Sequence, residues 1–259
     1  MTMTDQIQIE HLGQTGLKIN LGELTVLVDP YLSHSVEELE APDLIRQVPI
    51  AYEPESLTDV NWVLITHEHM DHCDPHTLPI LANKNPECRF MGPLAVREQL
   101  YKWGINEDRI LASTDVDINL GNALFVRSIA AAHPTIRMDQ HGNPQAVGYI
   151  FRYKERILYA AGDTSVCEEI IKILCNLPQI DIALLPVNED NYFRRQRGII
   201  GNMSVREAFE LARTVKIKQV IPVHWDMFKC NSTSQEEILA IYNSDIWPFN
   251  LGSIDSIKL

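Results

Sequence analysis

Three histidines and an aspartate lie within the seven-residue stretch Thr66-His67-Glu68-His69-Met70-Asp71-His72. Neutral imidazole nitrogens and carboxylate oxygens are ligands that zinc, manganese and iron accept in proteins. A lone histidine would be interpreted as part of a polar surface loop. Three of the nine histidines of the chain gathered beside an aspartate instead indicate a metal centre.

The sequence before this motif predicts how it is positioned. Residues 60–65 form a largely apolar run, which is typical of a buried strand. Strands and helices direct consecutive side chains to different faces, whereas a loop can direct several of them to one point. We therefore expect the histidine motif to be a loop that leaves the end of a strand.

The same arrangement, an apolar strand followed by a metal-binding residue type, recurs along the chain. Three further predicted strands end in this way and deliver Asp29 (after residues 24–28), Asp163 (after 157–161) and His224 (after 220–223). A strand-like run over residues 124–129 also precedes His133. Strand ends at one edge of a sheet are where α/β proteins usually carry their sites. We expect these residues to meet the histidine motif at such an edge.

Helices are predicted from cap residues and from the spacing of apolar residues. The expected helices begin at Asp74-Pro75, cover about 93–103 and 165–175, begin at the capping box Ser204-Val-Arg-Glu207, and begin at Ser234. A hairpin is expected over residues 7–12 and 17–21. Residues 32–56 are acidic and show little periodicity, so we expect a long excursion that forms one wall of the site. The mixture of elements predicts an α/β fold of mixed strand order.

The composition of the chain limits its partners. A length of 259 residues with 45% hydrophobic and 22% charged residues predicts a single globular domain over residues 1–259. The net charge of −13 argues against nucleic acid and membrane partners, because both usually need basic patches. The five cysteines form no Cys-x-x-Cys pair, and residues 1–7 lack the segments of a signal peptide, so a cytoplasmic location is expected. The sequence leaves open whether copies of the chain form a homo-oligomer.

The order of the candidate ligands resembles that of the metallo-β-lactamase superfamily, with Asp29 before the His67-x-His69-x-Asp71-His72 motif and His133, Asp163 and His224 after it. Within this superfamily the chain is most similar to the L-ascorbate-6-phosphate lactonase group of metal-dependent hydrolases. Four segments carry the similarity: His11-Leu-Gly-Gln-Thr-Gly16, Gly162-Asp-Thr164, Ile180-Asp-Ile-Ala-Leu184 and Val220-Ile-Pro-Val-His-Trp-Asp226. The resemblance implies a four-layer αββα sandwich of mixed β-sheets with a dinuclear site at one edge.

The resemblance also implies a role for each candidate ligand. One divalent ion, Zn or Mn, would be held by His67, His69 and His133, and the second by Asp71, His72 and His224. Asp163 would bridge the two ions, and Asp29 would accept a hydrogen bond from a ligand imidazole. His141 competes with His133 as a ligand, but we favour His133 because it follows a strand-like run.

Two divalent ions held in this way would make the site hydrolytic. They lower the pKa of bound water to about 7, and the two ions, two aspartates and a bridging hydroxide leave a net charge of about +1 that stabilises an oxyanion. We expect a metal-dependent hydrolase, with Asp71 as a catalytic residue, that opens a small anionic ester or lactone. A sugar-phosphate lactone is one candidate substrate. The alternatives are a metallo-phosphodiesterase and a non-catalytic metal-binding or sensing protein of the same fold.

Two further features each have two interpretations. Arg194, Arg195 and Arg197 follow a predicted strand in an otherwise acidic chain. They either form a solvated loop or bind the anionic group of the substrate. Cys73 lies next to His72, but burial of a small side chain is favoured over metal ligation.

Overall fold

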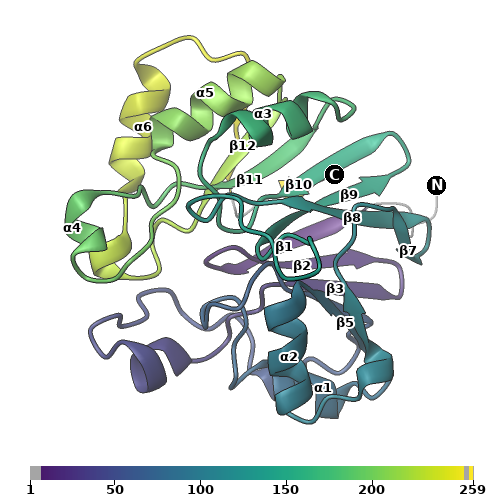
Figure 1. The fold of residues 1–259 in the computed structure, drawn as a ribbon. Coiled ribbons are helices and arrows are strands. Elements are labelled where there is room, and N and C mark those ends of the chain that lie inside the picture. Colours follow the sequence, from purple (N-terminus) through teal and green to yellow (C-terminus); the bar gives the residue numbers. More distant parts are fainter. Residues whose placement is uncertain (1–6, 254–256, 259) are drawn as a thin grey trace.

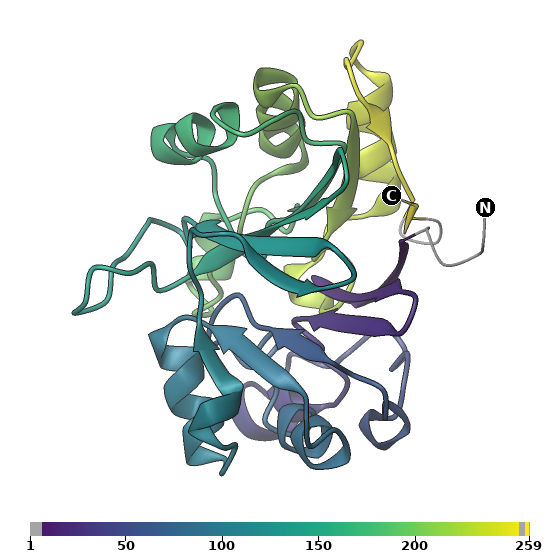
Figure 2. The ribbon, with the colours of Figure 1, turned by 90° about the vertical axis from the view of Figure 1, so that its right-hand side faces the viewer.

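Two seven-stranded β-sheets pack face to face, with helices on both outer sides (Figures 1 and 2). The computed structural model describes residues 7–253 and 257–258. The expected four-layer αββα sandwich with mixed sheets is confirmed. The expectation about a signal peptide concerns residues 1–7, of which residues 1–6 lie outside the described part.

The first sheet contains the N-terminal hairpin and the strand that precedes the histidine motif. Its strands in spatial order are β14 (Ile257–Lys258), β1 (Gln8–Gly13), β2 (Gly16–Leu21), β3 (Leu24–Val28), β4 (Trp62–Leu64), β5 (Arg89–Gly92) and β6 (Ile110–Ala112). The expected hairpin is confirmed as antiparallel β1 and β2, whereas β3 to β6 run parallel. Because β3 and β4 are parallel, Asp29 and the histidine motif leave the sheet at the same edge.

The second sheet contributes the remaining candidate ligands. Its strands in spatial order are β13 (Asn250–Leu251), β12 (Gln219–Val223), β11 (Ile182–Pro186), β10 (Arg156–Ala160), β9 (Val147–Tyr153), β8 (Leu124–Ala130) and β7 (Ile118–Gly121). Strands β10 to β13 are parallel, and β7 to β10 are antiparallel. Asp163 follows β10 and His224 follows β12, so both leave the sheet at the C-terminal ends of parallel strands.

Helices cover the outer face of each sheet. The first sheet carries α1 (Leu78–Lys84) and α2 (Leu94–Lys102), and the second carries α3 (Glu168–Cys175), α5 (Val205–Val215) and α6 (Gln235–Asn243). Short helical segments are η2 (Val36–Glu40), η3 (Pro54–Ser56), η4 (Glu107–Arg109), α4 (Tyr192–Arg195) and η5 (Lys229–Asn231). Within the described residues, the helices are too short or too polar to cross a bilayer.

Side chains along each strand alternate between the two faces of its sheet, so apolar side chains form three layers: one between the sheets and one under the helices on each outer face. Val26 and Val28 of β3 point into the core between the sheets, while Leu27 packs toward α1 and α2. Likewise Tyr149 and Phe151 of β9 point between the sheets. This alternation follows from the two-residue period of a strand. It leaves the strand ends at the sheet edges as the places where polar side chains can gather.

The start of α1 differs from the sequence expectation. The helix begins at Leu78, after the cap Thr77, and Asp74 lies one turn earlier. The Asp74 carboxylate still accepts the His76 backbone N–H at 2.9 Å, as a cap residue does, and it also accepts the Ser33 hydroxyl at 2.8 Å. Asp74 therefore caps the turn that leads into α1, but the prediction that the helix itself begins at Asp74-Pro75 is wrong.

The start of α3 also lies later than predicted, at Glu168 instead of about residue 165. The Ser165 N–H donates to the Ala132 carbonyl at 2.7 Å, and the Thr164 hydroxyl accepts from the Ala132 N–H at 3.0 Å. These bonds tie the segment after β10 to the segment after β8, so its backbone groups are engaged outside a helix. The capping box at Ser204 is confirmed at the start of α5, and Ser234 caps α6 as expected.

Candidate metal centre

The histidine motif is a loop held by Asp29. The Thr66 N–H donates to Asp29 Oδ1 at 2.8 Å, and the Thr66 hydroxyl donates to Oδ2 at 2.7 Å. The N–H groups of His72 and Cys73 then fold back on the His69 carbonyl at 2.9 and 2.7 Å. This turn brings the three imidazoles of the motif together, with ring centres of His67 lying 4.6 Å from His69 and 4.2 Å from His72.

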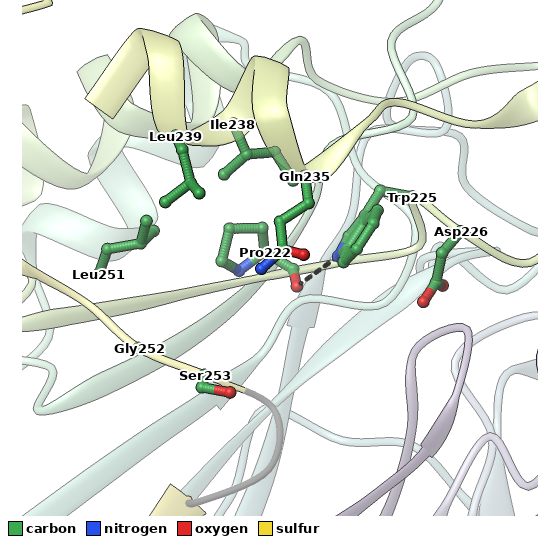
Figure 3. Close-up of a pocket in the computed structure, with 9 residues that line it drawn as sticks. All are labelled: Pro222, Trp225, Asp226, Gln235, Ile238, Leu239, Leu251, Gly252 and Ser253. Atoms are coloured by element: carbon green, nitrogen blue, oxygen red, sulfur yellow. Dashed lines mark hydrogen bonds between the residues drawn. The ribbon is translucent and has the colours of Figure 1, made fainter. Parts of the chain in front are cut away.

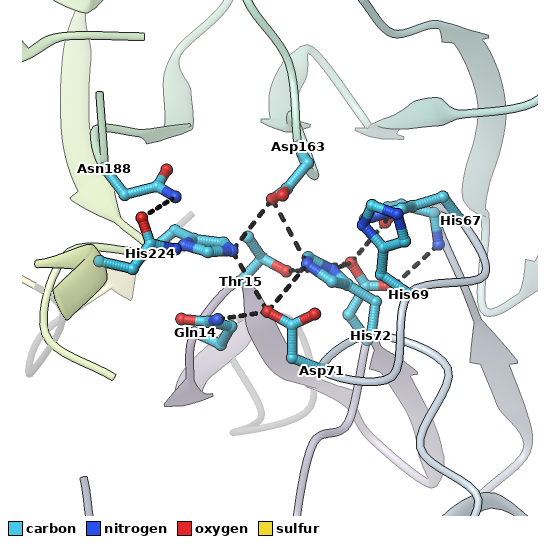
Figure 4. Close-up of polar contacts among 12 residues, drawn as sticks. Gln14, Thr15, His67, His69, Asp71, His72, Asp163, Asn188 and His224 are labelled. Atoms are coloured by element: carbon cyan, nitrogen blue, oxygen red, sulfur yellow. Dashed lines mark hydrogen bonds and ion pairs between the residues drawn. The ribbon is translucent and has the colours of Figure 1, made fainter. Parts of the chain in front are cut away.

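The structure gathers all seven expected ligands in one cluster, and Figure 4 labels six of them, all but His133. Their donor atoms form three overlapping groups, each with its atoms within 4.8 Å of one another: His67, His69 and His133; His67, His72 and Asp163; Asp71, His72 and His224. The first group and the last group match the two ligand sets expected from the sequence. Their role as metal ligands remains a prediction.

Asp163 lies between these groups. Its Oδ1 is 3.4 Å from His72 Nε2 and 3.3 Å from His224 Nε2. Its Oδ2 is 3.8 Å from His133 Nε2. The preceding Gly162 has φ +60°, and a Cβ there would lie 2.7 Å from the Thr66 side chain, so glycine allows the segment after β10 to approach the motif this closely. The two oxygens of Asp163 thus face two different groups of imidazoles.

The tip of the first hairpin reaches into the same region, which the sequence analysis did not foresee. The Gln14 side-chain amide donates to Asp71 Oδ2 at 2.5 Å, and the Gln14 carbonyl accepts from the His224 N–H at 3.1 Å. Gln14 is buried and has φ +56°. It therefore joins Asp71 of one group to the backbone that carries His224. The sequence signal was a polar residue between two glycines at the tip of a hairpin whose strands are apolar.

A network around Asp29 orients His72. Asp29 is fully buried, and its Oδ2 accepts from His72 Nδ1–H at 2.9 Å and from the Thr15 hydroxyl at 3.0 Å. With the proton held on Nδ1, the Nε2 of His72 faces Asp163 with its lone pair exposed. This is the contact expected of Asp29 from the sequence, and such partners fix the orientation and tautomer of ligand imidazoles.

Several polar atoms at the centre lack hydrogen-bond partners. Four buried atoms that converge here are unpaired: His67 Nε2, His72 Nε2, Asp163 Oδ1 and His224 Nε2. Buried polar atoms are rarely left unpaired in folded proteins. Nitrogen and oxygen donors without a cysteine suit zinc, manganese or iron. The residues present therefore fit divalent cations.

The charges and protonation states of the side chains at the centre also favour binding of cations. Burial and the neighbouring His72 and His69 hold the pKa of His67 well below its usual value, so this imidazole is neutral and keeps a free lone pair. Burial lowers the pKa of His72, but the carboxylates of Asp163, Asp71 and Asp29 outweigh it and raise the pKa to about 10. The carboxylates thus favour a positive charge at the place where His72 Nε2 points.

The structure separates the residues whose roles the sequence left open. His133 joins the cluster, with Nε2 3.2 Å from His69 Nδ1, whereas His141 is exposed in the turn that follows Asp139. Cys73 is buried, its thiol pKa is raised by burial, and it belongs to none of the ligand groups. The preference for His133 and for a buried Cys73 agrees with these positions.

The three arginines occupy different positions, and two of them have structural partners. The segment that carries them includes the short helix α4, which was not predicted. Arg194 donates to backbone carbonyls, among them Ser232 at 2.7 Å, and the Arg195 Nε donates to Asp190 at 2.8 Å. Arg197 lines the cavity beside the ligand cluster, and its side chain makes no ion pair or hydrogen bond with the described residues. Of the three, Arg197 is thus the one free to meet an anion.

That cavity has a volume of about 300 Å³ and opens beside His69, Asp71, Asp163 and His224. One wall is η2 and the residues that follow it, so the expected role of the 32–56 excursion agrees with the structure. A smaller cavity of about 70 Å³ lies on the other side, beside His67, His69 and His133. The centre is therefore accessible to a small molecule.

A separate cavity of about 350 Å³ lies between β12 and α6 (Figure 3). Its walls include Pro222, Ile238 and Leu251, and the Trp225 indole donates to the Pro222 carbonyl at 3.2 Å. Asp226 is its one carboxylate, and burial raises the pKa of that group. Because it lacks a cluster of ligand or nucleophilic side chains, we place the chemistry at the cavity beside Asp71.

Comparison with known proteins gives a family match and several relatives. A family model described as the Beta-lactamase superfamily domain matches residues 25–225. A protein of Methylacidiphilum infernorum (isolate V4), named as a metal-dependent hydrolase, is 28% identical over 251 residues, which cover 95% of this chain and 96% of that protein. In structure, the metallo hydrolase Igni18 of Ignicoccus hospitalis superposes with a TM-score of 0.71 at 15% identity, covering 98% of each chain.

Two longer relatives carry more specific names. The N-acyl-phosphatidylethanolamine-hydrolyzing phospholipase D 1 of Caenorhabditis elegans is 24% identical over 235 residues, 86% of this chain and 64% of that protein. A protein of Salmonella paratyphi B, named as a probable L-ascorbate-6-phosphate lactonase, is 25% identical over 211 residues, 76% of this chain and 58% of that protein. The chain thus spans less than two thirds of the length of either relative.

Proposed function

This chain belongs to the Beta-lactamase superfamily domain family, and from that premise we propose that it is a metal-dependent hydrolase that opens a small anionic ester or lactone. The observation that carries the proposal is a pair of ligand groups, with Asp163 lying between them, beside an open cavity. A structural zinc site is usually closed by four ligands, often cysteines. Seven nitrogen and oxygen donors next to a cavity support a hydrolytic site instead.

The clustered residues would have separate roles in holding two metal ions. His67, His69 and His133 would hold one ion, and Asp71, His72 and His224 the other, with Asp163 between them. When bound, two divalent ions supply Lewis acidity, which lowers the pKa of water to about 7 and stabilises negative charge on an oxygen. Asp29 keeps the His72 imidazole in the orientation that this requires.

Asp71 is suited to orient the attacking water. Burial raises its pKa, but the neighbouring His72 and His224 outweigh this and lower it below the usual value, so the group is a carboxylate at neutral pH. Gln14 holds Oδ2, while Oδ1 makes no hydrogen bond with the described residues. Oδ1 can therefore accept a hydrogen bond from water at the cavity.

The reaction consumes one water molecule. Its oxygen bonds to the acyl carbon, the bond from that carbon to the ester oxygen breaks, and the leaving oxygen receives a proton. Arg197 would bind the anionic group of the substrate at the wall of the cavity, because a guanidinium suits a carboxylate or phosphate. Loss of such a charge-assisted contact lowers kcat/KM by about one to two decades.

The named relatives support two more specific substrates. A sugar-phosphate lactone is supported by the lactonase relative, and a phosphodiester is supported as second candidate by the phospholipase relative. Both substrates carry an anion that Arg197 could bind. A non-catalytic metal-binding role is the alternative from another class, and it would leave metal content intact without turnover.

The test combines metal content with turnover in matched variants. We expect wild-type protein supplemented with Zn or Mn to hold about two ions per chain and to hydrolyse an anionic ester or lactone, with loss of activity after chelation. His133→Ala should lose metal and activity, whereas His141→Ala, a histidine outside the cluster, should keep both. Metal-loaded protein that turns over neither esters, lactones nor phosphodiesters would contradict the proposal.

A further inference from the structure

Apart from the candidate ligands, the walls of the cavity beside the candidate metal centre are mostly apolar. Val36, Ala41 and Leu44 line it on the side of η2. Ile199 and Ile200 line it on the side that follows α4, together with Phe228 from the segment before η5. Six apolar side chains thus face the space into which the clustered ligands open.

The cavity offers few other polar groups. Besides the clustered ligands, its polar side chains are Arg197, Glu40 and Asn231, and the Asn231 Oδ1 already accepts from Asn188 at 3.2 Å. A substrate with many hydroxyl groups would leave several of them without partners, which disfavours its binding. The wall chemistry therefore favours a substrate that is mainly apolar apart from one anionic group.

The two chain segments that line the cavity also carry exposed apolar side chains. Of the ten large hydrophobic side chains that are exposed in the described part of the chain, five lie on these two segments, and one of the five, Ile200, lines the cavity itself. They are Leu39 (58% exposed), Ile45 (56%), Tyr192 (68%), Phe193 (79%) and Ile200 (38%). Figure 1 shows α4 and the segment that contains η2 projecting on the same side of the molecule. Exposed apolar side chains on the segments that line a small cavity suit a ligand with a short apolar chain.

Resting on the proposed hydrolase function, we propose that the substrate is a small anionic amphiphile: an ester whose short acyl chain lies against these apolar walls. Its anionic group lies at the Arg197 wall, because the exposed Glu40 carboxylate on the opposite wall repels it. A volume of about 300 Å³ is at the small end of ligand sites, so the chain is short. The sugar-phosphate lactone named above becomes the competing outcome.

The first test is a chain-length series with metal-loaded protein. The probes are acyl esters of 4-hydroxybenzoate with acyl chains from acetyl to decanoyl; hydrolysis adds OH to the acyl carbon and returns a proton to the hydroxybenzoate oxygen. We expect kcat/KM to rise about fourfold per methylene until the chain fills the cavity. Phenyl esters of the same acids, which lack the carboxylate, should react about tenfold to a hundredfold more slowly.

Matched variants locate the effect. Ile200→Ser should lower kcat/KM for the octanoyl ester by about threefold to tenfold, with a smaller loss for the acetyl ester, because part of an aliphatic contact is removed. Ile246→Ser makes the same change at a side chain that is 92% exposed and outside the cavity, so kcat/KM should stay the same for both esters. Equal effects of both variants, or none from either, would overturn the proposed wall.

Binding without turnover separates this proposal from the hydrolase function. Calorimetry with butanoate and octanoate should give tighter binding and a more negative heat-capacity change for octanoate. If no ester is hydrolysed but this difference is found, the hydrolase function fails and the amphiphile site stands. If esters are hydrolysed without chain-length dependence, or a sugar-phosphate lactone is preferred, the amphiphile proposal is overturned. Turnover only in the presence of phosphatidylcholine vesicles would overturn it as well, in favour of a lipid surface.

Discussion

Asp163 directs its two carboxylate oxygens to two different groups of imidazoles, at distances of 3.3 to 3.8 Å. In Asp163→Asn one oxygen becomes an amide nitrogen, which is a donor and no longer a ligand. We expect this variant to lose affinity for both ions, whereas His69→Ala, which belongs to one group, should chiefly weaken one. Titration with Zn followed by elemental analysis measures both. A wild-type stoichiometry of one ion or fewer would contradict a dinuclear centre.

Asp29 acts on the centre through His72. We expect Asp29→Asn to fold, because asparagine tolerates the positive φ of +41° found here. It should weaken metal binding by about 10- to 100-fold, since the carboxylate that holds His72 Nδ1–H and the Thr66 loop is lost. Competition with a chelator gives the affinity, and Asp43→Asn, an exposed aspartate, is the control. Unchanged affinity would mean that Asp29 only shapes the turn before Pro30.

At the residue scale, the sequence predicted the ligands better than their supports. The positions of His67 and Asp163 follow from strand ends, because a buried apolar strand must end at an edge where polar groups can gather. Gln14 and Thr15 could not be found in this way. Their contacts with Asp71 and His72 join residues 57 positions apart. Such contacts depend on how the tip of the first hairpin packs against the loop of the histidine motif.

At the scale of elements, local signals predicted helices well where nothing else competed for them. The capping box at Ser204 formed, with both of its hydrogen bonds, and α5 buries an apolar face that includes Phe209. Asp74 also carries a cap signal, and its carboxylate accepts the His76 N–H, but the helix begins only at Leu78. The same carboxylate accepts hydrogen bonds from Leu32 and Ser33, about forty residues away, and such distant partners cannot be recognised from the local sequence.

Asp181 fastens the starts of three neighbouring strands. Its side chain, 5% exposed, accepts from the Ile157 N–H at 2.9 Å, from Arg156 at 3.0 Å and from Lys218 at 2.8 Å. We expect Asp181→Asn to lower the free energy of unfolding by about 1–3 kcal/mol, mostly because the buried Ile157 N–H then bonds to a neutral amide oxygen in place of a carboxylate. The two cations contribute less, since both are about half exposed and screened by solvent. Urea unfolding of the variant and of wild type measures the difference.

The effect of Asp181 should depend on pH in a defined direction. Burial raises its pKa, but the bonds from Lys218, Ile157 and Arg156 outweigh this and lower the pKa below the usual 3.8. A carboxylate whose pKa is lowered in the folded state stabilises the fold above pH 3.8. This stabilisation is lost as the pH falls through the pKa that the group has in the folded state. The difference in the free energy of unfolding between wild type and Asp181→Asn should therefore be largest at pH 7 and become smaller below about pH 4. A difference that grows on acidification would contradict this assignment.

At the scale of the whole molecule, the candidate ligands come from both halves of the sandwich. The histidine motif and Asp71 follow the first sheet, whereas His133, Asp163 and His224 follow strands of the second. The layer order could be predicted from strand alternation and helix caps together with the family resemblance. The apolar cavity could not, because its walls combine residues of η2 with residues that follow α4 and join only in the folded chain.

Because the ligands come from both sheets, bound ions should join the two halves and raise the thermal stability of the whole chain. A ligand at 100 times its dissociation constant stabilises by about 2.7 kcal/mol, which for a chain of this size raises Tm by about 5–10 °C. Calorimetric scans with increasing Zn or Mn should show this rise, and His141→Ala should behave like wild type. His133→Ala, which removes a ligand supplied by the second sheet, should show a smaller rise. The same rise with Mg, an ion that prefers oxygen ligands, would indicate binding to surface carboxylates of this chain of net charge −13 and not to the imidazole cluster.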